Sequence, residues 1–197
     1  GNKYKYYYRL VQPAGDSLSY RDDSVKIQFR FDEAAIRFQL QNLTRSDLRI
    51  DWTQPAIGLD GQFTAVRHAD NLYGDSLSTG LSHVIPSSGY LRDLLVPVQN
   101  MVFEGRRWIE RDLLPTCDDN DPAKRERILR SAGKRISVLL RMAFAGAGKS
   151  YRFDFSVDSV RQIAWRDYRP LKRTPPPPHL MPVAGGVDQI TAAVITV

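Results

Sequence analysis

The chain has 197 residues, of which 42% are hydrophobic and 25% charged, with a formal net charge of +6 and a pI near 9.5. This composition is ordinary for a globular chain with enough apolar residues to bury a core, and the length predicts one domain, or one domain with an appendage. The single cysteine, Cys117, excludes an intrachain disulfide, and no apolar run reaches the length of a transmembrane helix. The positive charge favours anionic partners, but the basic residues are scattered, which favours a solvated basic surface.

The first predicted strand covers residues 3–12, KYKYYYRLVQ, and we expect it at a sheet edge because its charges alternate with tyrosines. Residues 13–24 are rich in turn formers and predict a loop. Apolar and polar residues then alternate in opposite phase over 25–31 and 36–41, which predicts two half-buried strands joined by a short turn. The apolar positions are Val25, Ile27, Phe29 and Phe31 in the first strand and Ile36, Phe38 and Leu40 in the second.

Several short strands are predicted downstream, each bounded by turn-forming residues. Trp52 closes the first of them, and we expect its large ring inside the core. Asp60-Gly61 is a tight-turn dipeptide that predicts a hairpin. The predicted strands are 48–52, 55–61, 63–68 and 82–85, with a surface loop at 69–80 and an extended or short helical segment at 90–96.

One helical insertion is predicted at 122–132, because Asp121 can cap it, Pro122 suits its first position and Gly133 can end it. Residues 135–144 and 151–157 alternate strongly and predict a long hairpin. The regular turns and the alternation predict an all-β fold for residues 1–169, an antiparallel Ig-like β-sandwich of about seven to nine strands.

Residues 170–197 change in character. The proline run at 175–178 is stiff and extended, and it cannot build a core. The final segment, ITAAVITV at 190–197, is β-type, and we expect it to add as a strand to a sheet edge of its own domain or of a neighbour. The predicted partner-binding residues are Pro175, Pro176, Ile190, Val194 and Ile195 in this tail, and Arg106 and Arg107 in a basic turn.

No catalytic signature is found. Residues 145–150, AGAGKS, precede a strand instead of a helix and therefore predict a hairpin turn, not a phosphate loop. His68, His83 and His179 have no ligand spacing between them, and the acidic neighbours of Cys117 disfavour a reactive thiolate. We therefore expect no catalytic residue, no cofactor, no metal ligand and no enzymatic activity.

Six short patterns occur in a characteristic order. They are Asn42, the Ile-Asp-Trp of 50–52, the Asp60-Gly61 turn, Arg67-His68, Ile85-Pro86 and the alternating 151–155. In this order, over roughly residues 25–157, they resemble a family of uncharacterised bacterial cell-envelope proteins, often lipoproteins. The resemblance implies an Ig-like β-sandwich without known activity, exported to the periplasm or attached to the outer membrane. No signal peptide is present in the sequence, and a cleaved signal or a removed lipid anchor is compatible with that.

The leading hypothesis is therefore a non-enzymatic cell-envelope protein. It would bind or scaffold a protein partner, or form a homo-oligomer, by strand addition at a sheet edge or through its tail. The alternative is an anion or nucleic-acid binding module that uses the basic, Tyr-rich residues 3–9 and the basic cluster at 106–111. Nucleic acid is the less favoured ligand, because a tyrosine-rich strand with charges at its edge is more often a protected edge strand.

Overall fold

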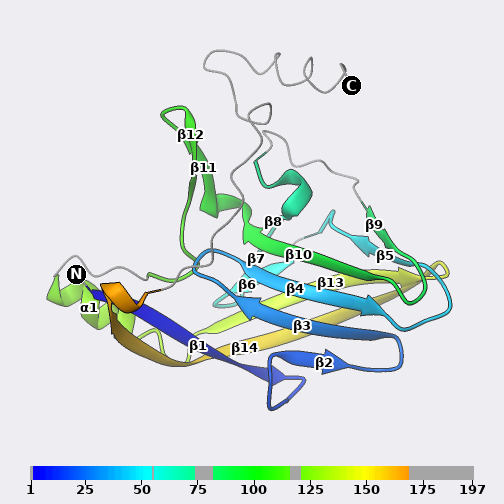
Figure 1. Ribbon diagram of the computed structural model, residues 1–197, viewed down its shortest axis with the longest axis horizontal. Helices are drawn as coiled ribbons and strands as arrows, with labels where there is room; N and C mark the ends of the chain where they lie inside the picture. The colour runs from blue at the N-terminus through cyan, green and yellow to red at the C-terminus, as the bar shows by residue number, and fades with distance from the viewer. Residues whose placement is uncertain (1, 55, 74–81, 116–120, 169–197) are drawn as a thin grey trace.

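The computed structural model describes residues 2–54, 56–73, 82–115 and 121–168 (Figure 1). Throughout these residues the strands pair in antiparallel fashion, and one α-helix is present. The predicted all-β class is therefore confirmed. The expectations for the tail, including Pro175, Pro176, Ile190, Val194 and Ile195, lie outside the described residues, as do those for Cys117 and His179.

The larger sheet has seven strands and contains the N-terminal strand. Its main path runs β1-β14-β13-β5-β9, while the short β6 pairs with β13 beyond the end of β5, and β7 pairs with β6. Its strands are β1 (Asn2–Gln12), β14 (Ala147–Ala164), β13 (Arg135–Phe144), β5 (Leu48–Asp51), β9 (Ser82–Ile85), β6 (Ile57–Leu59) and β7 (Gln62–Thr64).

The smaller sheet has five strands in the order β2-β3-β4-β10-β8. Its strands are β2 (Ser19–Arg21), β3 (Val25–Phe31), β4 (Ile36–Asn42), β10 (Tyr90–Pro97) and β8 (Val66–Arg67). A separate hairpin, β11 (Met101–Glu104) with β12 (Arg107–Glu110), projects away from both sheets in Figure 1. Short 3-10 turns occur at η1 (Ala69–Asn71), η2 (Val98–Asn100) and η3 (Trp165–Asp167).

The two sheets bury one shared core. Alternate residues of β3 and β4 point inward, and they meet alternate residues of β13 and β14. The ring of Phe29 lies 4.9 Å from that of Phe153 and 5.0 Å from that of Phe155, centroid to centroid. These contacts join the strongest predicted hairpin of each sheet, so the predicted two-residue period placed these phenylalanines correctly.

The helix begins where the sequence predicts. In α1 (Pro122–Leu129) the side chain of Asp121 accepts the N–H of Ala123 at 2.9 Å, which satisfies one free donor of the first turn. Gly133, at a φ of +84°, follows the helix in the left-handed region that glycine adopts without strain. The helix ends at Leu129, three residues before the predicted end, because a turn at 130–133 leads into β13.

Several expectations need correction. The described part of the chain has fourteen strands, more than predicted, because strands of two to four residues carry little period-2 signal. The predicted loop at 13–24 contains β2, and the predicted strand 63–68 divides into β7 and β8, which belong to different sheets. Trp52 is only half-buried, at the border of the core. Residues 90–96, predicted to be either extended or a short helix, are extended.

Candidate metal centre

Three side chains with metal-ligating atoms meet where the borders of the two sheets come together. His83 belongs to β9, an edge strand of the larger sheet, and Asp93 belongs to β10 of the smaller sheet. His68 directly follows β8, an edge strand of the smaller sheet, and precedes η1. One ligand atom from each of the three lies within 4.8 Å of the others. We call this group the His68–His83–Asp93 centre.

Strand periodicity explains why these polar groups point inward. Asp93 shares its face of β10 with Leu91 and Leu95, and it pairs in register with the core residue Phe38. His83 likewise shares its face of β9 with the buried Ile85. Both strands thus direct a polar side chain toward the space between the sheets, at positions where an apolar residue is usual.

The carboxylate of Asp93 faces both imidazoles. Its Oδ2 lies 3.6 Å from Nδ1 of His83 and 3.9 Å from Nδ1 of His68. The side chains of His68 and Asp93 are each only 1% exposed, whereas that of His83 is 21% exposed and gives solvent access to the centre. Both ring nitrogens of His68 and Oδ2 of Asp93 are buried without a hydrogen-bond partner. Buried polar atoms rarely lack a hydrogen-bond partner in native proteins. Their presence here marks this centre as functional or strained.

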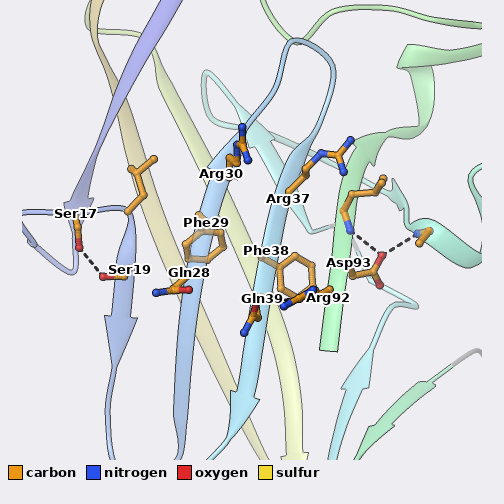
Figure 2. A pocket seen from close by; sticks show the side chains of 13 residues that line it. Ser17, Ser19, Gln28, Phe29, Arg30, Arg37, Phe38, Gln39, Arg92 and Asp93 are labelled. Atoms are coloured by element: carbon orange, nitrogen blue, oxygen red, sulfur yellow. Dashed lines mark hydrogen bonds between the residues drawn. The ribbon is translucent and has the colours of Figure 1, made fainter. Parts of the chain in front are cut away.

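The remaining polar atoms of Asp93 and His83 are fixed by neighbours. Oδ1 of Asp93 accepts the backbone N–H of Ala69 at 2.8 Å and of Leu94 at 2.7 Å, two contacts drawn in Figure 2. Nε2 of His83 lies 2.6 Å from Oδ2 of Asp70. These contacts leave Oδ2 of Asp93 and Nδ1 of His83 facing each other.

Trp52 borders the same space from the end of β5. Its Nε1–H donates to Nδ1 of His83 at 3.0 Å, so this nitrogen is the acceptor and Nε2 carries the proton shared with Asp70. The indole ring also stacks on the imidazole of His68, with 5.4 Å between centroids and 20° between planes. The two imidazoles meet edge to face at 5.1 Å.

Burial controls the protonation of the centre. It lowers the pKa of His68, against the opposing effect of Asp93, and it raises the pKa of Asp93, against the hydrogen bonds from Ala69 and Leu94. Both shifts favour the uncharged forms, because the low-polarity interior penalises an ion that lacks a close partner. A neutral His68 has a lone pair available for a metal ion.

The predicted basic site is in a different element. Arg106 and Arg107 are exposed at the turn of the β11–β12 hairpin, while Trp108 packs on Phe103 and beneath the guanidinium of Arg67. In this turn Trp108 therefore packs against its neighbours, and the side chains of Arg106 and Arg107 are solvated. The AGAGKS segment is a hairpin turn, as predicted, with Ala145 and Gly146 at positive φ.

Sequence spacing could not reveal the centre, because 69–82 and 84–92 separate its members along the chain. A usable signal existed in the strand pattern. Asp93 interrupts an apolar face of 91–95, and His83 occupies a core-facing position two residues before Ile85. Charged or imidazole groups at core-facing positions in two strands indicate a site when the strands meet in space.

Comparisons with known proteins found no matching family model, no matching curated protein and no matching solved structure. The resemblance to envelope proteins therefore stays a prediction. In the described ranges, no helix is long and apolar enough to cross a membrane. The class of molecule defined by the fold and the site is thus a two-sheet, antiparallel β protein with a histidine–aspartate centre between its sheets.

Proposed function

We propose that this protein binds a divalent transition metal ion, Zn²⁺ in the first instance, through Nδ1 of His68, Nδ1 of His83 and Oδ2 of Asp93. The observation that carries the proposal is the set of buried atoms without hydrogen bonds on His68 and Asp93, directed at a common point with His83. Two imidazoles and one carboxylate are a donor set that zinc uses in proteins.

The distances are compatible with such an ion. Two ligands placed about 2.1 Å from a tetrahedral zinc ion lie roughly 3.4 Å apart. Oδ2 of Asp93 is 3.6 Å and 3.9 Å from the two imidazole nitrogens, so movements of about half an ångström or less would close these two pairs. Three protein ligands leave the fourth position of a tetrahedral ion for water or another small ligand.

The surrounding contacts also suit a metal site. Metal-binding histidines usually donate their other ring N–H to a carboxylate, which is the role of Asp70 toward His83. Backbone amides orient the carboxylate of Asp93 in the same way. A dication would also stabilise the ionised form of Asp93, which burial otherwise disfavours.

The test is zinc titration of the full-length, chelator-treated protein by calorimetry and thermal unfolding. We expect one site per chain and, at a hundredfold excess over the dissociation constant, about 2.7 kcal/mol of stabilisation. For a chain of this size that stabilisation corresponds to a rise in melting temperature of roughly 5–10 °C. Asp93→Asn and His83→Gln should fold and lose this response, because each removes one ligand while retaining a polar side chain of similar size.

Asp47→Asn is the matched control, since Asp47 is exposed in the turn before β5. It should respond to zinc as the unaltered protein does. The proposal is rejected when the unaltered protein shows no saturable binding, or when Asp93→Asn keeps the full zinc response. Parallel titrations with Co²⁺, Ni²⁺ and Fe²⁺ establish which ion the site prefers.

We propose a protein contact at a sheet edge as the second candidate function. Within the described residues, β1 pairs with β14 alone, so the other side of this eleven-residue strand is a sheet edge. Register shifts near Tyr7/Tyr8 and Leu10/Gln12 and the outward charges of the strand oppose unspecific pairing, so a partner would need a complementary strand. Light scattering on the full chain tests self-association at this edge, and a chain that stays monomeric argues against it. A chain that ends at Thr174 tests the expected contact through the tail, where unchanged mass and unchanged partner retention argue against that contact.

The finer expectations remain proposals of the same kind. They are an Ig-like relationship of the two sheets, a non-enzymatic role and a location in the bacterial cell envelope. The two facing antiparallel sheets with one shared core support the first of them. Fractionation of the native host with an antibody against the protein tests the location.

A further inference from the structure

A groove of about 770 Å³ crosses the outer face of the five-stranded sheet (Figure 2). Its floor is formed by β3 and β4, with the segment that leads into β2 on one side and with β10 and Ala69 on the other. This volume is within the range of small-molecule sites in proteins. The polar side chains of the groove floor point away from the core, whereas the proposed metal ligands point between the sheets, and Asp93 borders both places.

The strand register sets the polar side chains of the floor in two rows. One row pairs Arg30 of β3 with Arg37 of β4. The next row crosses four strands through Ser19, Gln28, Gln39 and Arg92. Neighbouring strands lie about 4.8 Å apart, so these hydroxyl, amide and guanidinium donors present a regular array toward the groove.

The array carries an excess of positive charge. Arg30 and Arg37 are directly opposite each other, an arrangement of like charges that costs stability in a sheet. Asp32 compensates Arg37 by accepting its Nε–H at 3.0 Å. Among the described residues Arg30 forms no ion pair, and Arg92 donates its Nε–H to the neutral amide of Gln39 at 3.0 Å.

The other carboxylate at the groove is already engaged. Asp93 lines the β10 side, but its Oδ1 is held by two backbone amides and its Oδ2 faces the histidines. The groove therefore offers two guanidinium groups, Arg30 and Arg92, whose Nη atoms are available to a ligand. Guanidinium forks bind carboxylate and phosphate oxygens in pairs, which makes oxyanions the complementary ligands.

We infer that this groove binds a small organic anion that carries two or more phosphate or carboxylate groups, with Arg30 and Arg92 as the principal contacts and Gln28 and Gln39 as neutral donors between them. The apolar side chain of Leu94 borders the groove and would contact the uncharged part of the ligand. This site differs from the basic regions expected from the sequence, which lie at 3–9 and 106–111.

The experiment is calorimetric titration of the metal-free, full-length protein at low ionic strength with tripolyphosphate and, separately, with citrate. We expect saturable binding of one molecule per chain, weakened about tenfold by Arg30→Gln and about tenfold by Arg92→Gln. Binding should also weaken as salt is added, because the groove is open to solvent. Arg37 is left unaltered, because it forms an ion pair with the buried Asp32 and its replacement would disturb that pair.

Arg49→Gln is the matched control. It removes the same charge from an exposed position on β5 of the other sheet and should leave the affinity unchanged. Binding of tripolyphosphate alone, with loss in the two test variants, supports the inference with phosphate as the ligand chemistry; binding of citrate alone supports it with carboxylate. Absence of binding of both compounds, or equal weakening by Arg49→Gln, overturns it.

Discussion

The indole Nε1–H of Trp52 donates to Nδ1 of His83 over 3.0 Å, at the imidazole nitrogen that also lies 3.6 Å from the carboxylate of Asp93. The indole N–H and the proposed metal ion therefore compete for the same lone pair, that of Nδ1 of His83. A metal ion bound at Nδ1 must displace Trp52, so the hydrogen bond holds the centre in order before binding and opposes binding itself.

Trp52→Phe should therefore strengthen zinc binding about fivefold, because a neutral hydrogen bond contributes on the order of 1 kcal/mol and phenylalanine retains a ring beside His68. Calorimetry on the unaltered and variant proteins measures the change in zinc affinity.

In the unaltered protein, zinc should also change tryptophan fluorescence. Trp165→Phe should preserve that fluorescence change, since Trp165 is exposed in η3; an unchanged zinc affinity in Trp52→Phe contradicts competition for Nδ1.

Asn42 connects the end of β4 to the turn after β9 and should be essential for stability. Its buried Nδ2 donates to the carbonyl oxygens of Ser46 and Ile85 at 2.7 Å and 3.0 Å, and its Oδ1 accepts from Thr44. Asn42→Ala should lower the free energy of unfolding by about 2–3 kcal/mol, because these buried carbonyls lose their donor. Asn42→Asp should be worse, because a carboxylate cannot donate to them.

Chemical denaturation with urea measures both variants of Asn42. Gln41→Ala is the control, since Gln41 directly precedes Asn42 in β4 and points to the opposite face. Its effect should stay within about 0.5 kcal/mol. Equal effects of Gln41→Ala and Asn42→Ala would show that the hydrogen bonds of Asn42 contribute nothing specific.

Asp22 connects the two sheets, and its hydrogen bonds should make the free energy of unfolding depend on pH in the acid range. Its Oδ2 accepts from Lys149 Nζ and Tyr151 Oη, both at 2.9 Å, on the opposite sheet. Burial alone would raise the pKa of Asp22, but these hydrogen bonds, with those from the backbone of Val25 and Ser24, hold the pKa well below its usual value of 3.8.

Because the folded pKa is below the unfolded one, this contribution is complete at neutral pH and is lost as the pH falls from about 5 toward the folded pKa. Asp22→Asn should lower stability at pH 7 by about 1–2 kcal/mol and flatten its decline in acid, measured by urea denaturation from pH 7 to pH 2. The exposed neighbour Asp23, changed to Asn, serves as the control. A decline in Asp22→Asn as steep as in the unaltered protein would assign the acid sensitivity to other groups.

Phe155 should be among the residues whose truncation costs most. Its side chain is fully buried and contacts Phe29 and Phe31 of the facing sheet, at 5.0 Å and 5.1 Å between centroids. Phe155→Ala should lower the free energy of unfolding by about 3–5 kcal/mol through the lost burial and the cavity it leaves. Phe63→Ala, at a ring that is 38% exposed on β7, should cost no more than about 1 kcal/mol. Thermal unfolding of both variants gives the comparison, and equal losses would contradict a core between the sheets.

The sequence by itself determined the alternating parts of the long strands and which side of each faces the core, although β14 (Ala147–Ala164) extends beyond the predicted 151–157 at both ends. In β3, β4, β13 and β14 the alternation has a period of two, and this local property does not depend on the partner strand. The helix cap at Asp121 and the hairpin at Ala145 and Gly146 were equally local, because they depend on neighbours within a few residues. The shortest strands were not recoverable, since two to four residues fit several conformations.

The tertiary structure alone decided where the chemistry lies. His83 and Asp93 come from strands of different sheets, and His68 directly follows β8. Only the division of 63–68 between the sheets and the position of β9 beside β5 bring the three together. The same holds for Arg30 and Arg92, which share one groove because β4 lies between their strands. Side-chain direction is encoded over a few residues, but proximity between distant segments depends on strand order, which the packing of the whole core sets.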